Sequence, residues 1–115
     1  MTYEDFNEVL MDQIETCIKV LGRKNKEYAR GNDKLSNFKK AGVMDNTTPE
    51  KALWGMWKKH IVSIMDIIFD LDNGIEPDPD VLNEKIVDMV NYPILLKALL
   101  IERKRKNNEK VISGS

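Results

Sequence analysis

Four polar side chains in the last third of the chain have the spacing of a magnesium site. Asp80, Glu84, Asp88 and Asn91 follow one another at intervals of four, four and three residues. On a helix this spacing places all four on one side. Mg²⁺ prefers oxygen ligands, and one or two carboxylates commonly hold it together with the phosphates of a substrate. The stripe therefore indicates metal-assisted phosphate chemistry, and a solvated helix face is the alternative.

The charged residues fall into two blocks of opposite sign. The chain has 18 Lys and Arg residues and 19 Asp and Glu residues, so its net charge is close to zero. Most of the charged residues between positions 19 and 40 are basic, and this block could hold phosphates. Most of the charged residues between positions 66 and 88 are acidic. This block could hold a divalent cation, to which Asp66 and Asp70 could contribute ligands. The alternative is that both blocks are solvated faces that attract each other.

Other reactive residue types do not form a recognisable centre. The single cysteine, Cys17, excludes an internal disulfide and a cysteine zinc cluster, and the single histidine, His60, has no second imidazole as a metal partner. Cys17 falls on an apolar helical stripe and is expected to be a buried thiol. His60 lies near another such stripe and is expected to be a hydrogen-bonded core or interface residue.

Helices must position these residues, because apolar residues recur at helical spacing and no segment alternates as a strand would. The pattern predicts an all-α fold. Three long helices are expected, from the N-terminus to about residue 29, over 49–72 and over 80–104, with one short helix within 31–48. Thr48 and Pro49 have the residue types of a helix start. Leu35 and Phe38 are expected to anchor the short helix in the core.

Two helix faces lead to further expectations. The helix over 49–72 is apolar around most of its circumference, which predicts a homo-oligomer built through it. The last helix is expected to bury the face that carries Leu82, Ile86, Val90, Leu96 and Leu100. Residues 1–106 are predicted to form a single helical domain, and residues 107–115 a disordered tail.

Composition excludes several classes of protein. Hydrophobic residues make up 42% of the chain and charged residues 32%, which is typical of a globular protein and too apolar for a disordered one. No apolar run reaches about 18 residues, so no membrane span is expected. The balanced charge argues against a general nucleic-acid coat. The acidic N-terminus lacks the apolar region of a signal peptide, so a cytoplasmic location is expected.

Two short stretches resemble motifs of a known family. Residues 24–29 (KNKEYA), continued by residues 33–38 (DKLSNF), resemble a K-N-x-D/E-Y motif that follows a first helix. Residues 84–92 (EKIVDMVNY) resemble an E-x-x-x-D-x-x-N-Y motif on a late helix. Together they look like small phage and prophage proteins of the nucleotide-modification-associated type. Those proteins are loosely similar to the MazG-like all-α nucleoside triphosphate pyrophosphohydrolases.

The resemblance implies a nucleotide site with Mg²⁺ as cofactor in a helical oligomer, in the cytoplasm of the host if a phage encodes the chain. Carried over residue by residue, Glu84 and Asp88 would be metal ligands, and Asn91 would orient a ligand or a substrate group. Lys24, Lys26 and Tyr28 would lie near the phosphates or the base.

Three functional hypotheses follow. The first is Mg²⁺-dependent hydrolysis of a nucleoside triphosphate or a related nucleotide at Glu84 and Asp88. The second is a phage anti-defence protein without enzymatic activity, which sequesters a nucleotide signal, cyclic nucleotides included, through Arg23, Lys24 and Arg30. The third is a module that binds and inhibits a host protein through its apolar helices and the basic run 103–106.

Overall fold

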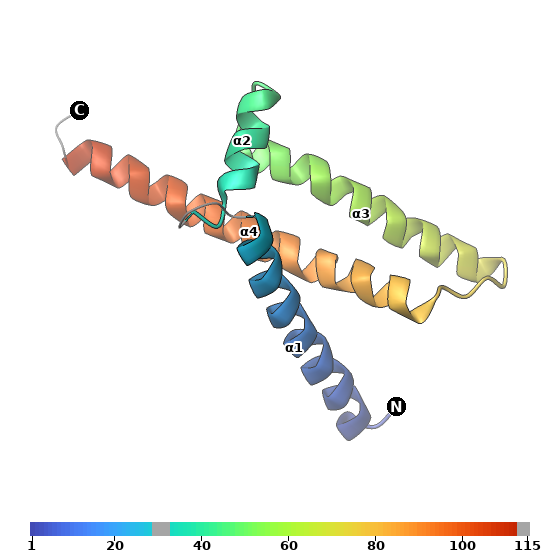
Figure 1. Ribbon diagram of the computed structural model, residues 1–115. Helices are drawn as coiled ribbons and strands as arrows, with labels where there is room; N and C mark the ends of the chain where they lie inside the picture. Colours follow the sequence, from blue (N-terminus) through green and yellow to red (C-terminus); the bar gives the residue numbers. More distant parts are fainter. Residues whose placement is uncertain (29–32, 113–115) are drawn as a thin grey trace.

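The computed structural model describes residues 1–28 and 33–112, with side chains at 1–22 and 33–111. Within these residues the chain forms α-helices and no strand (Figure 1). The helices are α1 (Tyr3–Tyr28), α2 (Ser36–Met44), α3 (Pro49–Asp72) and α4 (Pro79–Ile112). The predicted all-α fold of three long helices and one short helix is confirmed. No helix in the described part of the chain is long and apolar enough to span a membrane.

The helices form an open arrangement around α4. α3 and α4 run antiparallel, α2 packs against the start of α3, and α1 crosses α4 near its middle (Figure 1). The described residues extend over 60 × 32 × 24 Å. The N-terminal half of α1 and the C-terminal third of α4 project from this crossing in different directions.

Local sequence sets the helix ends. The Thr48 hydroxyl accepts a hydrogen bond from the Lys51 amide at 3.2 Å, and Pro49 occupies the first turn of α3, as the residue types predict. At the other end of α3, Gly74 has a φ of 74°, in the left-handed region that favours glycine. Gly42 in α2 faces the turn before α3, where an added Cβ would lie 2.9 Å from the carbonyl carbon of Thr48. This close backbone approach sets how α2 meets α3.

The core lies where α2, the first half of α3 and α4 meet. Leu35, Leu53 and Leu99 are buried together, and Leu53 is fully inaccessible to solvent. Phe38 and Tyr92 pack against this cluster. The prediction that Leu35 and Phe38 anchor the short helix is confirmed.

The face that α4 buries is only partly the expected one. Leu82, Ile86 and Leu96 are partly buried, and Leu96 packs against the core cluster. Val90 is 39% exposed and Leu100 is 49% exposed, whereas Val87 and Asp88 are 3% and 6% exposed. The part of α4 that carries the polar stripe faces the interior, because polar residues of the stripe contact α1 and α3. Asn91, for example, donates a hydrogen bond from Nδ2 to the Cys17 carbonyl of α1 at 3.4 Å.

The end of α4 also differs from the expected one. Residues 107–112 are helical, and α4 continues past the expected end near residue 104. These residues lack an apolar stripe, but extending an existing helix costs far less than nucleating a new one. Lys, Arg and Glu, which make up most of residues 102–110, favour helix, and Lys106 and Glu102 form an i,i+4 ion pair at 3.3 Å.

Candidate functional site

A cavity of about 330 Å³ lies between α1 and the first half of α4. Three members of the predicted stripe, Asp80, Glu84 and Asp88, line it. The other lining residues are Thr16 and Val20 of α1 and Asn83 and Val87 of α4. The spacing of the carboxylates along one helix therefore does bring them to one cavity, and α1 supplies the opposite wall.

The stripe passes from solvent into the protein interior along α4. Asp80 and Glu84 are exposed, whereas Asp88 and Asn91 are 6% and 5% exposed. The Asn91 amide nitrogen is hydrogen-bonded to α1, but its Oδ1 is buried without a hydrogen-bond partner among the described residues. A buried amide oxygen without a partner is rare and is a candidate acceptor for a ligand or an ordered water.

The Asp88 carboxylate meets the histidine of α3. Asp88 Oδ2 lies 3.2 Å from His60 Nδ1, at ion-pair distance but without the alignment of a hydrogen bond. His60 Nε2 lies 3.4 Å from the Tyr92 hydroxyl, and Tyr92 stacks on Trp57 with a ring-centroid separation of 6.5 Å. His60 is therefore a polar residue of the α3–α4 interface, as predicted. The His60 ring, which contacts Tyr92, therefore lies against the Asp88 carboxylate.

The spacing of the polar stripe did not identify Tyr92 as a partner of His60. Tyr92 follows Asp88 by four residues, so both lie on the same side of α4. That relation was visible in the sequence. The contact with His60 was not visible, because it depends on the register between α3 and α4.

Two other candidate ligands lie elsewhere. Asp66 and Asp70 belong to α3 and are not among the residues that line the cavity. In the described part of the chain, no group of three or more His, Cys, Asp or Glu side chains is placed to hold a metal ion. Mg²⁺ keeps several waters and needs only one or two carboxylates plus substrate phosphates. The pair Glu84 and Asp88 fits that requirement.

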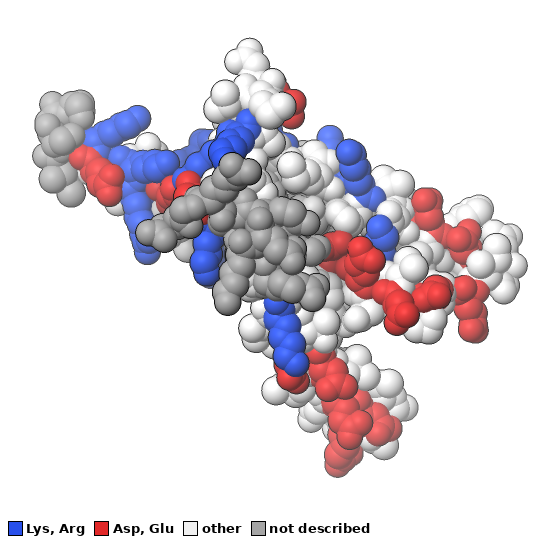
Figure 2. Space-filling view, in the orientation of Figure 1, with Lys and Arg blue, Asp and Glu red and all other residues white. Residues whose placement is uncertain are grey.

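The predicted phosphate-binding residues are outside the part of the chain whose side chains the structure describes. This holds for the side chains of Arg23, Lys24, Lys26 and Tyr28, and Arg30 lies outside the described residues. The basic run 103–106 is largely exposed on the projecting part of α4, where Figure 2 shows Lys and Arg atoms gathered. Asp and Glu atoms gather on α1, at the C-terminal end of α3 and at the N-terminal end of α4.

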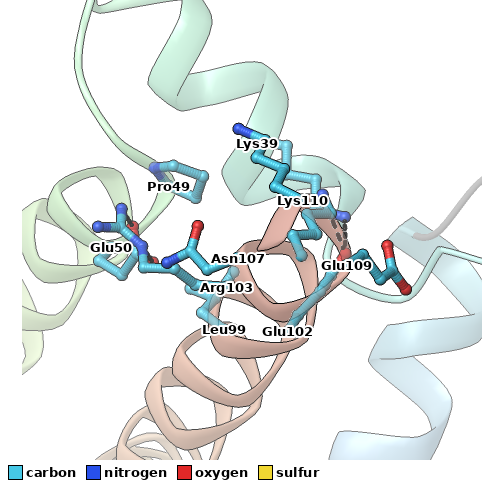
Figure 3. Close-up of a pocket in the computed structure, with 10 residues that line it drawn as sticks. Lys39, Pro49, Glu50, Leu99, Glu102, Arg103, Asn107, Glu109 and Lys110 are labelled. Carbon is cyan, nitrogen blue, oxygen red and sulfur yellow. Dashed lines mark hydrogen bonds and ion pairs between the residues drawn. The ribbon is translucent and has the colours of Figure 1, made fainter. Parts of the chain in front are cut away.

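A second cavity, of about 480 Å³, lies where α2, the start of α3 and the projecting part of α4 meet (Figure 3). Its cations are paired with carboxylates. Arg103 donates two hydrogen bonds to Glu50, at 2.9 and 2.8 Å, and Lys39 contacts Glu102 at 2.5 Å. These pairs clamp α4 to α2 and α3. Four cations (Lys39, Arg103, Lys106 and Lys110) and three carboxylates (Glu50, Glu102 and Glu109) line this cavity, so its excess is a single positive charge. That is too little to select a polyanionic ligand by charge alone.

The Lys39 cluster has a predictable dependence on pH. Lys39 also contacts Asp33 at 2.7 Å, and these hydrogen bonds lower the pKa of the Asp33 and Glu102 carboxyls and raise the pKa of Lys39. The carboxylates therefore stabilise the fold above their unfolded pKa values, near 4, and this contribution is lost as pH falls through their lowered values. The contribution of Lys39 is lost only as pH rises past its raised pKa.

Replacing Lys39 with methionine should therefore lower the free energy of unfolding by about 1 kcal/mol at neutral pH. The difference from the unmodified protein should shrink at about pH 3, where the carboxyls are protonated. Urea unfolding at both pH values measures it. Lys40→Met, at an exposed neighbouring position of α2, is the control and should change little. An equal loss at both pH values would contradict the assignment.

Comparison with protein-family models, with curated proteins and with solved structures finds no match to this chain. Its resemblance to nucleotide-modification-associated and MazG-like proteins rests on the two sequence motifs, and it stays a prediction. The cavity between α1 and α4 is consequently the main guide to function.

Proposed function

We propose that the chain is a phage-type nucleotide-handling protein that binds Mg²⁺ with Glu84 and Asp88 and hydrolyses a nucleoside triphosphate or a related nucleotide. One observation carries the proposal. The carboxylates of the acidic stripe line a cavity between two helices. Beyond the cavity lining the stripe ends at Asn91, whose buried amide oxygen has no hydrogen-bond partner in the described part of the chain. A solvated helix face would have neither the cavity nor the buried end.

The residues of the chain have separate tasks in this proposal. Asp88 is held at its place by His60 and by the burial of its helix face. Glu84, one turn closer to solvent, lies where an incoming phosphate chain would arrive. Asn91 lies just beyond the residues that line the cavity, and in this proposal its Oδ1 would orient a ligand group. When bound, Mg²⁺ would supply Lewis-acid polarisation of the phosphoryl oxygens, which favours attack by water on the phosphoanhydride.

A second candidate function is sequestration of a nucleotide, including a cyclic signalling nucleotide, without chemistry. The absence of a third acidic metal ligand among the described residues favours this candidate. An anti-defence role of this kind requires tight binding that persists in EDTA, with the nucleotide recovered intact. Inhibition of a host protein is the remaining alternative, which would use exposed apolar helix surface rather than the cavity.

A thermal-shift panel separates these functions. The panel contains nucleoside mono-, di- and triphosphates and cyclic dinucleotides, each with Mg²⁺ and with EDTA. A ligand at 100 times its dissociation constant adds about 2.7 kcal/mol of stability, which raises the melting temperature by several degrees in a domain of this size. We expect a shift with triphosphates that requires Mg²⁺, followed by release of pyrophosphate or phosphate.

Each other outcome has a defined meaning. A shift with a cyclic nucleotide that persists in EDTA would replace hydrolysis by sequestration. No shift with any nucleotide would overturn the proposed function and leave the acidic stripe without a ligand.

A further inference from the structure

Half of α1 has an apolar side that nothing in the described structure covers. Phe6, Val9, Leu10 and Ile14 recur at helical spacing, and between 43% and 55% of each is exposed. They lie on the part of α1 that projects from its crossing with α4 (Figure 1). Acidic side chains occupy the other side of this half-helix. Because helices of this kind are stabilised mainly by burying their apolar side, the projecting half of α1 requires a partner.

α3 has a second apolar side as well. Leu53, Trp57 and Ile64 lie on the side that packs toward α4. About a third of a turn away around the helix, at 100° per residue, a separate exposed stripe begins. Its members are Trp54, Val62, Met65, Ile68 and Phe69, between 46% and 67% exposed. We call these five residues the α3 stripe.

The two uncovered surfaces differ in length, but they carry complementary charges. The α1 side spans about 12 Å from Phe6 to Ile14, and the α3 stripe spans about 22 Å, at 1.5 Å per residue. Residues 1–16 contain five acidic residues (Glu4, Asp5, Glu8, Asp12 and Glu15) and no Lys or Arg. Along the α3 stripe, residues 51–69 contain three lysines in the first half (Lys51, Lys58 and Lys59) and one acidic residue, Asp66, in the second half. Figure 2 shows red atoms along α1 and blue atoms over the first half of α3.

We propose that a second copy of this chain covers both surfaces. In a two-fold dimer, α1 of each copy packs its apolar side on the α3 stripe of the other copy. Both surfaces belong to the same chain, so one such contact occurs twice in the dimer. In each contact the α1 side covers about half the length of the α3 stripe. The acidic side of α1 then lies beside the lysines at the start of the partner's α3, which fixes the orientation.

The first measurement is the mass of the full-length protein in solution, by light scattering after size exclusion. We expect twice the mass of one chain. Ile14→Lys in α1 and Met65→Glu in the α3 stripe should each reduce the mass to that of a single chain, with helicity retained by circular dichroism. Val43→Lys and Met44→Glu are matched controls, because these two residues of α2 are 80% and 84% exposed and belong to neither surface. Both controls should remain dimeric.

Mixing the two variants tests the pairing of α1 with α3. In a mixed dimer, the new lysine of one copy meets the new glutamate of the other, and the second contact is unmodified. We therefore expect the equimolar mixture to recover the dimer mass, whereas each variant alone does not. Recovery would exclude an interface in which α1 meets only α1.

Two outcomes would overturn the inference. A single-chain mass for the unmodified protein would assign the two surfaces to a different protein. Failure of the mixture to dimerise, with both variants folded, would show that α1 does not meet α3. Because no nucleotide is present in these measurements, they succeed or fail separately from the proposed hydrolysis.

Discussion

Replacing Asp88 with asparagine should reduce Mg²⁺-dependent nucleotide hydrolysis at least about 100-fold, since loss of even the groups that orient metal ligands commonly costs 10- to 100-fold. Asparagine keeps the shape of the buried side chain beside His60, but it removes the negative charge that attracts the cation. The variant should keep the helical circular dichroism of the unmodified protein, with a lower melting temperature because the charge beside His60 is lost. Phosphate or pyrophosphate release, measured over a range of Mg²⁺ concentrations, reports the loss.

The comparison variants isolate the role of the cavity. Glu84→Gln removes the second proposed ligand and should give a loss of similar size. Asp45→Asn removes an exposed acid next to α2 that does not line the cavity, and turnover should be unchanged. Unreduced turnover in both cavity variants would remove Glu84 and Asp88 from the proposed chemistry, whatever the nucleotide.

Replacing Leu53 with alanine should lower the free energy of unfolding by about 3 kcal/mol. Leu53 is the fully buried member of the core cluster, where it packs with Leu35 and Leu99 from two other parts of the chain. Truncation removes apolar contact and leaves a space between helices that the neighbours can only partly fill. A typical domain is stable by about 5–15 kcal/mol, so this change removes a large share. Urea unfolding followed by circular dichroism measures it.

Leu71→Ala is the matched control for this variant. Leu71 lies on the same helix but is half exposed near the α3–α4 turn, so its loss should be below about 1 kcal/mol. Similar losses at the two positions would mean that the core is not concentrated where α2, α3 and α4 meet. A stability unaffected by Leu53→Ala would contradict the packing of this cluster directly.

The helices of this fold were predictable because their signals are local. Thr48 and Pro49 mark the start of α3 with side-chain chemistry alone, and the period of apolar residues sets the helix lengths. The orientation of α4 was not predictable in the same way. Its apolar residues surround most of the helix, so periodicity did not distinguish the side of Leu99 from the side of Leu100. Packing against α1 and α3 determines which side of α4 is buried.

The candidate site shows the same division. Glu84 and Asp88 lie one turn apart on one helix, and their shared cavity follows from helical geometry. His60 lies 28 positions before Asp88 in the sequence, and their contact follows only from how far α3 and α4 slide along each other. Sequence alone indicated a polar role for His60, but it did not indicate the carboxylate that it meets.

The projecting part of α4 has a consequence for amide hydrogen exchange. All side chains from residue 103 to residue 111 are exposed, so few buried contacts oppose the opening of these last helical turns. Helix ends open locally at free energies well below that of global unfolding. Amides around Leu99 open only with the core, whereas amides toward Ile112 exchange through fraying. The continuous helix α4 therefore contains a gradient of protection, from a slowly exchanging middle to a rapidly exchanging end.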